Sequence, residues 1–566
     1  MARHVVWVVL TACSLRAVPE PPTEAPAPEA QPVEVPPVEV EQAAVPRDTG
    51  WPLTVDPGAN RADATDWTWR AVAGTDAARP PTLDKVRMLP RAFGDQVSTF
   101  RGGTLRAGAS HGRVDGEPVR FEKRWTFETS EGFLHGGRKR DWGGSAGWTG
   151  QPALIQWSPE VRKTLNLRPE LRDDEGFVEV IVGSLDGWVY FLDLRDGRPS
   201  RTATFPNVMA PGEPSRHLNT GNPIKGAVTI HPEGLPMMVV GQGLIEDVEI
   251  GSRFYRLTDG EELLFLRGKD SRAHRGWGAF DSSPLFDTAH DLAWVPGENG
   301  LLYRVQLGTN LAGGELTLSP VVHALAYRPT HHEKQGIENS MSAWRNLAWY
   351  ADNGGTLFCM NLETNEVVWT WHGETAADTN ASLAVDVVDG VPYLYRGTEH
   401  EPETLGPNSY IARHHGLTGE QLWAVAVPTA DVAPMSHGGV YGTPAVGRHQ
   451  ADGLVYVTVS HAPSKEHGTL LALERETGAI RWKQVVPRYV WSSPLVVYND
   501  AGHPWVFQAD VGGHVQLLDG LSGEILHAEP SGSLIQASPS SWNSRVVMPL
   551  LGTQIVAYDL VAGAAE

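Results

Sequence analysis

The sequence predicts an all-β protein, an eight-bladed β-propeller of four-stranded antiparallel blades. Eight copies of one short pattern lie between Gly183 and Gly563: a glycine, a strand of alternating apolar residues, an acidic or amide residue, and usually a second glycine. Alternation with a period of two is typical of strands. The copies recur about every 52 residues, which is the spacing of propeller blades.

Each copy predicts one strand bounded by tight turns, where glycine adopts a positive φ most easily. Three tryptophans, Trp369, Trp423 and Trp482, each follow four residues after the turn that ends such a strand, and we expect them to pack in the core. The copies span residues 183–197, 251–263, 299–308, 354–369, 409–423, 468–482, 512–526 and 552–563.

A second pattern precedes most copies, a small or polar residue followed by proline and an apolar residue. Proline is tolerated at the first residue of a strand, so this pattern predicts where each blade begins. A further strand, such as residues 177–184 or 453–460, lies between the two patterns, so each unit is predicted to have four strands. The starts are at 150, 221, 282, 442, 492 and 537, with proline-free variants at 339 and 381.

The last copy is incomplete, because only three residues follow Gly563. The segment Phe121–Phe127 has the alternation of a strand and lies before the first blade. We therefore predict that this N-terminal strand pairs into the last blade, which closes the ring and removes an exposed sheet edge.

The N-terminus reads as a short secretory signal, residues 1–12, ending at Leu10-Thr11-Ala12-Cys13. This end resembles a bacterial lipobox, which implies acylation of Cys13, and by the same resemblance Ser14 favours the outer membrane. Residues 13–50 are rich in proline and glutamate and predict an extended spacer. Residues 51–120 are expected to form a partly ordered arm, and residues 121–566 the propeller.

Charge and composition limit the partners. The formal net charge is −21, from 46 basic and 67 acidic residues, which argues against nucleic acid and against an anionic membrane face. No segment reaches the 18 apolar residues of a membrane span. The second cysteine, Cys359, lies on a predicted strand and is expected to be a small buried apolar group.

The repeats resemble a known family. Thr477-Gly478-Ala479-Ile480-Arg481-Trp482 and the matching stretch 417–423 are similar to PQQ-like repeats, and the resemblance covers residues 121–563. It implies one of two roles: a quinoprotein dehydrogenase, or a non-catalytic protein of the BamB-like lipoprotein branch. The vicinal cysteine pair typical of quinoprotein alcohol dehydrogenases is absent, and the chain resembles the BamB-like branch more.

The segments before each first strand should converge on one mouth of the central channel, so polar and aromatic residues there are the candidate binding residues. Among them, Asp281, Glu338 and Asp378 with Asn339 could supply oxygen ligands to calcium; alternatively they satisfy strand-end backbone groups and water. The candidates are Trp148, Asn219, Lys225, Trp277, Asp281, Glu338, Asn339, Asp378, Asn380, His437 and Trp491.

The sequence therefore predicts a lipid-anchored, periplasm-facing scaffold that binds protein partners at the cell envelope, with outer-membrane protein assembly as the candidate process. No catalytic residue, metal ligand or cofactor is expected in this role. The alternative is a PQQ-dependent periplasmic oxidoreductase of the alcohol or sugar dehydrogenase type, which would hold PQQ and calcium. A third option is glycan or protein recognition through Trp148, Trp277 and Trp491.

Overall fold

The computed structural model describes the propeller nearly throughout. The described residues are 53, 55, 60, 67–88, 96–130, 133–135, 138–140, 146–147, 150–206, 212–243, 249–329, 331–432 and 438–563. The predicted signal, the lipidation site Cys13 and the acidic spacer lie outside them.

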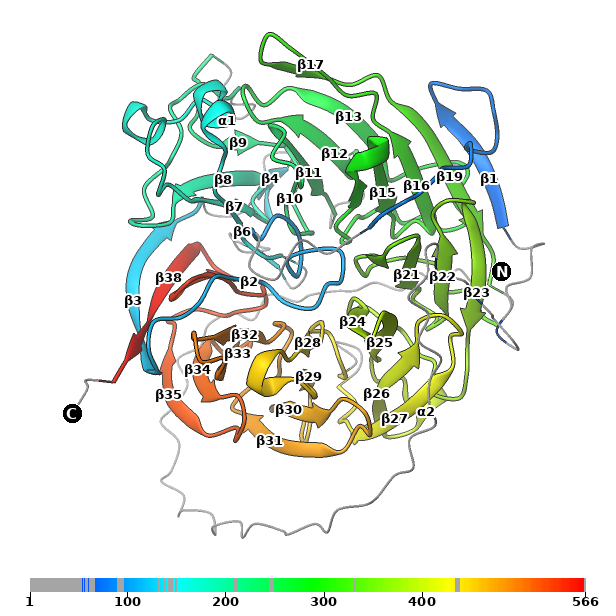
Figure 1. The fold of residues 1–566 in the computed structure, drawn as a ribbon, viewed down its shortest axis with the longest axis vertical. Helices are drawn as coiled ribbons and strands as arrows, with labels where there is room; N and C mark the ends of the chain where they lie inside the picture. Colours follow the sequence, from blue (N-terminus) through cyan, green and yellow to red (C-terminus); the bar gives the residue numbers. More distant parts are fainter. Residues whose placement is uncertain are drawn as a thin grey trace.

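Eight antiparallel blades form a ring, which confirms the predicted fold class (Figure 1). Successive blades follow the chain around the ring, and in each one the first strand lies nearest the centre. Blades 1 and 2 are built from β6 (Ala153–Ile155), β7 (Glu179–Gly183), β8 (Trp188–Asp193) and β9 (Leu218–Asn219), and from β10 (Thr229–Ile230), β11 (Met237–Gly241), β12 (Gly251–Arg256) and β13 (Glu262–Arg267).

Blades 3 to 5 continue the ring. Blade 3 has β14 (Leu285–Asp287), β15 (Leu292–Pro296), β16 (Leu301–Gln306) and β19 (Val321–Tyr327). Blade 4 has β20 (Ser342–Trp344), β21 (Leu347–Ala351), β22 (Leu357–Asn361) and β23 (Glu366–Trp371). Blade 5 has β24 (Ala384–Val388), β25 (Val391–Gly397), β26 (Asn408–His415) and β27 (Gln421–Pro428).

Blades 6 to 8 complete it. Blade 6 has β28 (Ala445–Val446), β29 (Leu454–Ser460), β30 (Gly468–Glu474) and β31 (Ile480–Val486). Blade 7 has β32 (Leu495–Tyr498), β33 (Pro504–Ala509), β34 (His514–Asp519) and β35 (Ile525–Pro530). Blade 8 has β36 (Ser540–Trp542), β37 (Arg545–Leu550) and β38 (Gln554–Ala562), completed by β3 (Pro118–Glu128).

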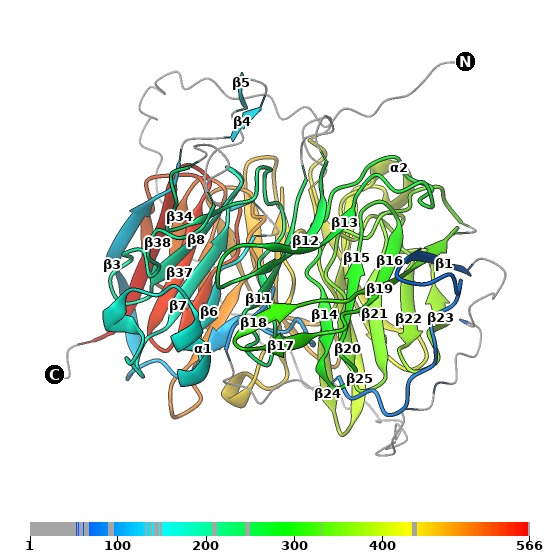
Figure 2. The same ribbon diagram turned by 90° about the horizontal axis from the view of Figure 1, so that it is seen from above.

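Short elements outside the blades make up the rest of the described structure. Two hairpins, β4 (Phe133–His135) with β5 (Arg138–Arg140) and β17 (Asn310–Ala312) with β18 (Glu315–Thr317), form separate two-stranded sheets. In the edge view of Figure 2, the β4–β5 hairpin stands off one face of the disc. The helices are α1 (Pro159–Thr164) and α2 (Pro402–Leu405), with 3-10 turns η3 (Pro169–Leu171), η4 (Thr288–His290) and η5 (His449–Ala451).

The strand β3 closes the ring as predicted, since it pairs antiparallel with β38 from Phe121 opposite Leu560 to Phe127 opposite Ile555. Trp125 on β3 packs against the turn glycine of blade 1, where a Cβ added to Gly197 would lie 2.6 Å from the indole. Its Nε1 donates to the Leu194 carbonyl at 2.9 Å. The same contact joins Trp369, Trp423 and Trp482 to Gly419, Gly478 and Gly523 of the next blade.

Two blades have a fifth strand that the sequence did not predict. β1 (Trp67–Ala73) pairs antiparallel with β19 at the outer edge of blade 3. β2 (Ser110–His111) pairs parallel with β36 at the inner edge of blade 8. Both come from the N-terminal arm, which carries no repeat and so gave no periodic signal.

Hydroxyl groups before the inner strands link consecutive blades. The hydroxyls of Ser340, Ser382 and Thr443 each accept the amide of the equivalent residue one blade earlier, over 2.8, 2.8 and 3.0 Å. Ser493 and Ser538 do the same over 2.9 and 3.0 Å. The small polar residue of the blade-start pattern is thus explained, because a short side chain with an oxygen acceptor satisfies a buried amide there.

Residues 97–114 run through the centre of the ring, where Figure 1 shows them in blue. Main-chain hydrogen bonds join this central segment to the inner strands of seven blades, and the Arg106 side chain reaches the Ser283 and Pro284 carbonyls of blade 3. The main-chain pairs are Val97 with Leu154, Ser98 with Ile230, Thr104 with Ala343, Leu105 with Val385, Ala107 with Val446, Ala109 with Ser541, and Val114 with Tyr498.

Candidate functional site

Charged side chains gather at one mouth of the channel because two kinds of segment reach it. In an antiparallel blade the segment before the first strand and the turn between the second and third strands lie at the same end. Asp281 and Glu338 precede β14 and β20, whereas Glu298 lies in the turn between β15 and β16. The site therefore combines residues of blades 3 and 4.

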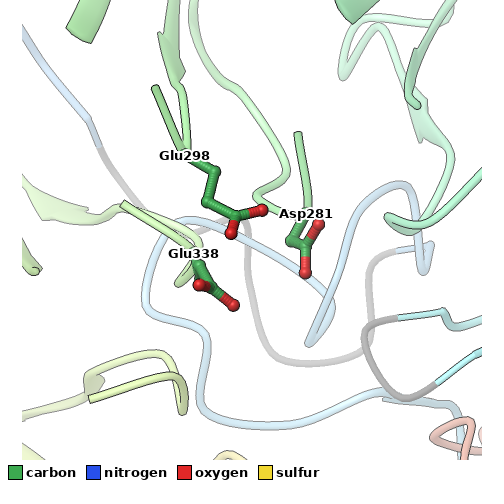
Figure 3. A group of neighbouring side chains, drawn as sticks. All are labelled: Asp281, Glu298 and Glu338. Carbon is green, nitrogen blue, oxygen red and sulfur yellow. The ribbon is translucent and has the colours of Figure 1, made fainter. Parts of the chain in front are cut away.

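Three carboxylates form the centre of this mouth. Asp281, Glu298 and Glu338 each place an oxygen within 4.8 Å of the others, and Figure 3 shows the three groups turned toward one another. Asp281 and Glu298 are 2% and 3% exposed, so their charges are almost fully removed from water. Such a group needs compensating cations or protons.

Two cations supply that compensation. The Lys225 ammonium lies 2.7 Å from Asp281 Oδ2 and 3.6 Å from Glu298 Oε2. The Arg275 guanidinium lies 3.2 Å from Glu298 Oε1 and 3.9 Å from Glu338 Oε1. Burial disfavours the Lys225 charge, but the carboxylates outweigh it and raise the pKa of Lys225 above its usual value.

The carboxylates differ in how readily they ionise. Burial opposes ionisation of Glu298, yet Lys225 and Arg275 bring its pKa below the usual value, helped by hydrogen bonds from Glu338 and Trp277. Burial and the nearby Glu298 charge raise the pKa of Glu338 well above its usual range. Burial raises the pKa of Asp281 to about 7 in spite of Lys225. The surroundings thus favour the protonated form of Glu338 and the ionised form of Glu298.

The polar cluster continues into blade 5. Asn353 Nδ2 donates to Glu338 Oε1 at 2.7 Å and to Asp378 Oδ1 at 3.3 Å, and so bridges these two groups. Asn380 donates to Glu399. Burial, with the neighbouring Glu399 charge, raises the pKa of Asp378 well above its usual range. Burial, with the Glu338 charge, raises the pKa of Glu399 to about 8.

The residues at this mouth do not fit the calcium ion of the quinoprotein alternative. Lys225 Nζ already lies within 2.7 Å of one carboxylate of the cluster and 3.6 Å of another, where a bound cation would need to sit. Asp378 is joined to Glu338 through Asn353 and is not a member of the close carboxylate group. Asn339, the fourth proposed ligand, uses its side-chain amide to bond the Ala351 and Thr379 carbonyls, each at 2.8 Å.

The other predicted residues lie apart from the cluster or support the backbone. Asn219 accepts the amide of Gly221 at 2.7 Å and so shapes a turn. Trp491 packs against Tyr441, with ring centroids 5.2 Å apart, and against Tyr489 at 6.0 Å. Trp148 and His437 lie outside the described residues.

The sequence did not single out Glu298, Arg275, Asn353 or Glu399. Glu298, Asn353 and Glu399 lie at the turn between the second and third strands of their blades, where the sequence pattern indicates a turn but no binding residue. The Gly-Glu-Asn-Gly turn at 297–300 carries the signal that could have found Glu298, an acidic residue in a glycine-flanked turn at the same end of the blade.

Over the described ranges, the structure has no helix that is both long and apolar enough to span a membrane. No curated protein matches the sequence of this chain. Residues 407–565, which cover the two outer strands of blade 5, blades 6 and 7 and the three C-terminal strands of blade 8, match the family model described as outer membrane protein assembly factor BamB.

Solved structures are similar to this chain at low sequence identity, and the first one below shares its fold. The quinohemoprotein alcohol dehydrogenase ADHIIG from Pseudomonas putida HK5 is 11% identical with a TM-score of 0.53, over 85% of this chain and 84% of that one. BamB from Moraxella catarrhalis is 14% identical with a TM-score of 0.43, over 73% of this chain and 98% of that one. The eight-bladed ring and the family match of residues 407–565 make this chain similar to PQQ-like repeat β-propeller proteins.

Proposed function

We propose that this protein is a non-catalytic scaffold that binds protein partners, anchored by lipid at Cys13 and facing the periplasm. The observation that carries the proposal is that the chain occupies the centre of its own ring with residues 97–114. A propeller whose centre is taken by its own main chain has its outer surfaces and loops left for recognition.

The charged mouth supports the same proposal. Its buried carboxylates lie against the cations Lys225 and Arg275, and burial favours the protonated form of Glu338, which reduces the net negative charge of the cluster. The ion pairs between these groups help to hold the loops that carry them in one arrangement. This favours a structural role over the binding of a charged cofactor.

Exposed apolar side chains lie on the outer parts of the disc. Leu311 at the β17–β18 hairpin is 50% exposed, and Leu422, Ile480 and Ile525 on the outer strands of blades 5, 6 and 7 are 41%, 48% and 38% exposed. Apolar side chains on a rigid rim are suited to contacts with protein partners.

The candidate process is outer-membrane protein assembly, which is the process named by the family model that matches residues 407–565. The test is affinity capture of the full chain from detergent-solubilised envelopes, with the recovered proteins quantified. We expect enrichment of barrel-assembly components over capture with an unrelated lipoprotein. A variant carrying Leu422→Asp and Ile480→Asp should recover less of them. Leu534→Asp serves as the matched surface control, because Leu534 is 48% exposed but lies between β35 and β36, outside the outer strands.

Two results would contradict the proposal. Recovery of no barrel-assembly component by the full chain would remove the assembly role. In the second result, the purified protein develops a quinone absorbance with PQQ and calcium and oxidises alcohols or sugars in a dye-linked assay. This result would support the oxidoreductase function in place of the scaffold function.

A further inference from the structure

Arg101 is a buried cation without a partner. Its side chain lies in the central segment and is 1% exposed. Within the described part of the chain, Nε, Nη1 and Nη2 have no hydrogen-bond partner, and no carboxylate lies within ion-pair distance. A guanidinium carries five N–H donors, so five donors are removed from water without replacement.

Arg106, five residues later, shows how this fold satisfies a buried arginine. It is 0% exposed, and its Nε and Nη atoms donate to five oxygens of the surrounding chain. The acceptors are the carbonyls of Phe100, Ser283, Pro284 and Met341 and the hydroxyl of Thr99, over 2.8 to 3.2 Å. Two arginines of one segment, equally buried, thus differ in that only one is satisfied by the protein itself.

The unpaired group remains a cation at neutral pH. Burial lowers the pKa of Arg101 to about 9, which still leaves the guanidinium charged at pH 7. A neutral water molecule can accept a hydrogen bond from it but leaves the charge without a counterion. A second donor in the same turn, the Thr104 hydroxyl, is also buried without a partner.

The backbone around Arg101 is held in place, and open space lies at two glycines of the same turn. The Arg101 amide donates to Gln151 Oε1 at 3.1 Å. Gly102 has φ +82° and lies so close to the Gly108 carbonyl that a Cβ would be 2.3 Å from that oxygen. A Cβ added at Gly103 or Gly108, in contrast, would meet no heavy atom within 4 Å, so there is open space at these two positions of the turn.

We propose that Arg101 forms the binding site of a small oxyanion, a phosphate or a carboxylate, beside the turn 101–108 at the centre of the ring. Phosphate and carboxylate match the planar fork of a guanidinium with two parallel hydrogen bonds. The Thr104 hydroxyl is a further donor in the same turn. This site is separate from the carboxylate cluster and does not depend on the proposed scaffold role.

The test measures thermal unfolding of the full chain in sodium phosphate, acetate or sulfate against sodium chloride of equal ionic strength. We expect a saturable rise of about 1–3 °C in the unfolding midpoint for the preferred anion. The three anions distinguish a phosphate site from a carboxylate site. In Arg101→Leu the saturable rise should disappear, while the midpoint in chloride should be no lower than that of the unmodified chain, because an uncompensated charge has been removed.

Equilibrium dialysis with radiolabelled phosphate or acetate gives a second readout, with about one anion bound per chain expected and none in Arg101→Leu. Arg106→Leu is the matched control, and it should lower the midpoint in every buffer because it leaves five buried acceptors without a donor. Equal responses of the unmodified chain and Arg101→Leu to all anions would overturn the proposal. The absence of any saturable response in the unmodified chain would assign the space to water and overturn it as well.

Discussion

At the level of single residues, the blade-start pattern is the feature whose physical reason the structure makes clearest. The proline lies directly before the first strand of a blade, and the residue before the proline carries the hydroxyl that accepts an amide from the preceding blade, as at Thr443, Ser493 and Ser538. The pattern recurs because each inner strand meets its neighbour in the same way. Ser283 is the exception, since its own hydroxyl has no partner in the described structure.

This exception allows a matched pair of substitutions. Ser340→Ala removes the acceptor of the Ser283 amide, 2.8 Å away, and leaves a buried N–H unsatisfied, so we expect a loss of about 1–3 kcal/mol in the free energy of unfolding. Ser283→Ala removes a hydroxyl that makes no hydrogen bond and should change stability by less than about 0.5 kcal/mol. Chemical denaturation of both variants measures the difference. Equal losses in the free energy of unfolding would show that the hydrogen bonds between consecutive blades do not stabilise the ring.

A second residue-level prediction concerns pH. Glu399 has a pKa of about 8 in the folded protein and about 4.3 when unfolded. Between these values the folded state holds a proton that the unfolded state has lost, so stability falls as pH rises through this window. Glu399→Gln cannot ionise, and it should be about as stable as the unmodified chain near pH 4.5 and more stable by roughly 2–4 kcal/mol near pH 8.5.

Denaturant midpoints of both proteins at pH 5 and pH 8.5 test this expectation. Glu401, which is close in sequence and pairs with Lys334 at 2.6 Å, provides the control Glu401→Gln, whose effect should stay small at both pH values because the pair is near the surface. A difference between Glu399→Gln and the unmodified chain that is constant with pH would contradict the assigned ionisation.

At the level of elements, the sequence predicted what repeats and missed what does not. The eight periodic copies predicted the eight blades. The incomplete last copy predicted the N-terminal strand that pairs into blade 8, which is β3. β1, β2 and the central segment carry no repeat, and their places depend on contacts with strands far away in the chain, such as Leu105 with Val385. Local pattern gives no information on such pairings.

The candidate site likewise contains some residues that the sequence predicted and others that it missed. Asp281, Glu338 and Lys225 were found because they precede inner strands, a position that periodicity locates. Glu298 and Arg275 were missed, although Glu298 lies within 4.8 Å of both other carboxylates and Arg275 lies 3.2 Å from Glu298. Which turns converge depends on three-dimensional closure of the ring, and ionisation depends on burial, so neither follows from spacing alone.

Removal of the N-terminal elements one at a time tests what each contributes. A chain that begins at Gln96 lacks β1 and the arm residues around it, such as Met88, which pairs with Arg345, and should remain monomeric with cooperative unfolding. A chain that begins at Glu117 also lacks the central segment and should unfold at a midpoint lower by several degrees, roughly 2–6 °C, since hydrogen bonds to the inner strands of the blades are lost.

A chain that begins at Ser130 lacks β3 as well and leaves the β38 edge and the Trp125 contact unfilled. An open edge strand pairs readily with other chains, so this variant should associate or aggregate. Gel filtration and thermal unfolding of the three chains give the comparison. A monomeric, cooperatively folding chain from Ser130 would show that β3 does not close the ring in solution.

At the level of the whole molecule, the long N-terminal region separates the folded disc from the proposed anchor. Residues 18–46 contain nine prolines and six glutamates without lysine or arginine, a composition typical of an extended spacer. If Cys13 carries the acyl chains, the disc is tethered at a distance that lets its rim reach partners in the envelope. The tether then determines where the scaffold acts, whereas the propeller determines what it binds.

The anchor is tested by Cys13→Ser. Acyl chains bury many methylene groups in the bilayer, each contributing about 0.8 kcal/mol, so the unmodified protein should sediment with membranes and incorporate labelled palmitate. Cys13→Ser should lose the label and leave the membrane fraction. Cys359→Ser is the control, because Cys359 is 0% exposed on β22 and cannot be acylated in the folded protein; it should keep both the label and the membrane association. If Cys13→Ser stays in the membrane fraction, lipid at this residue is not the anchor, and attachment has to come from the partners of the propeller.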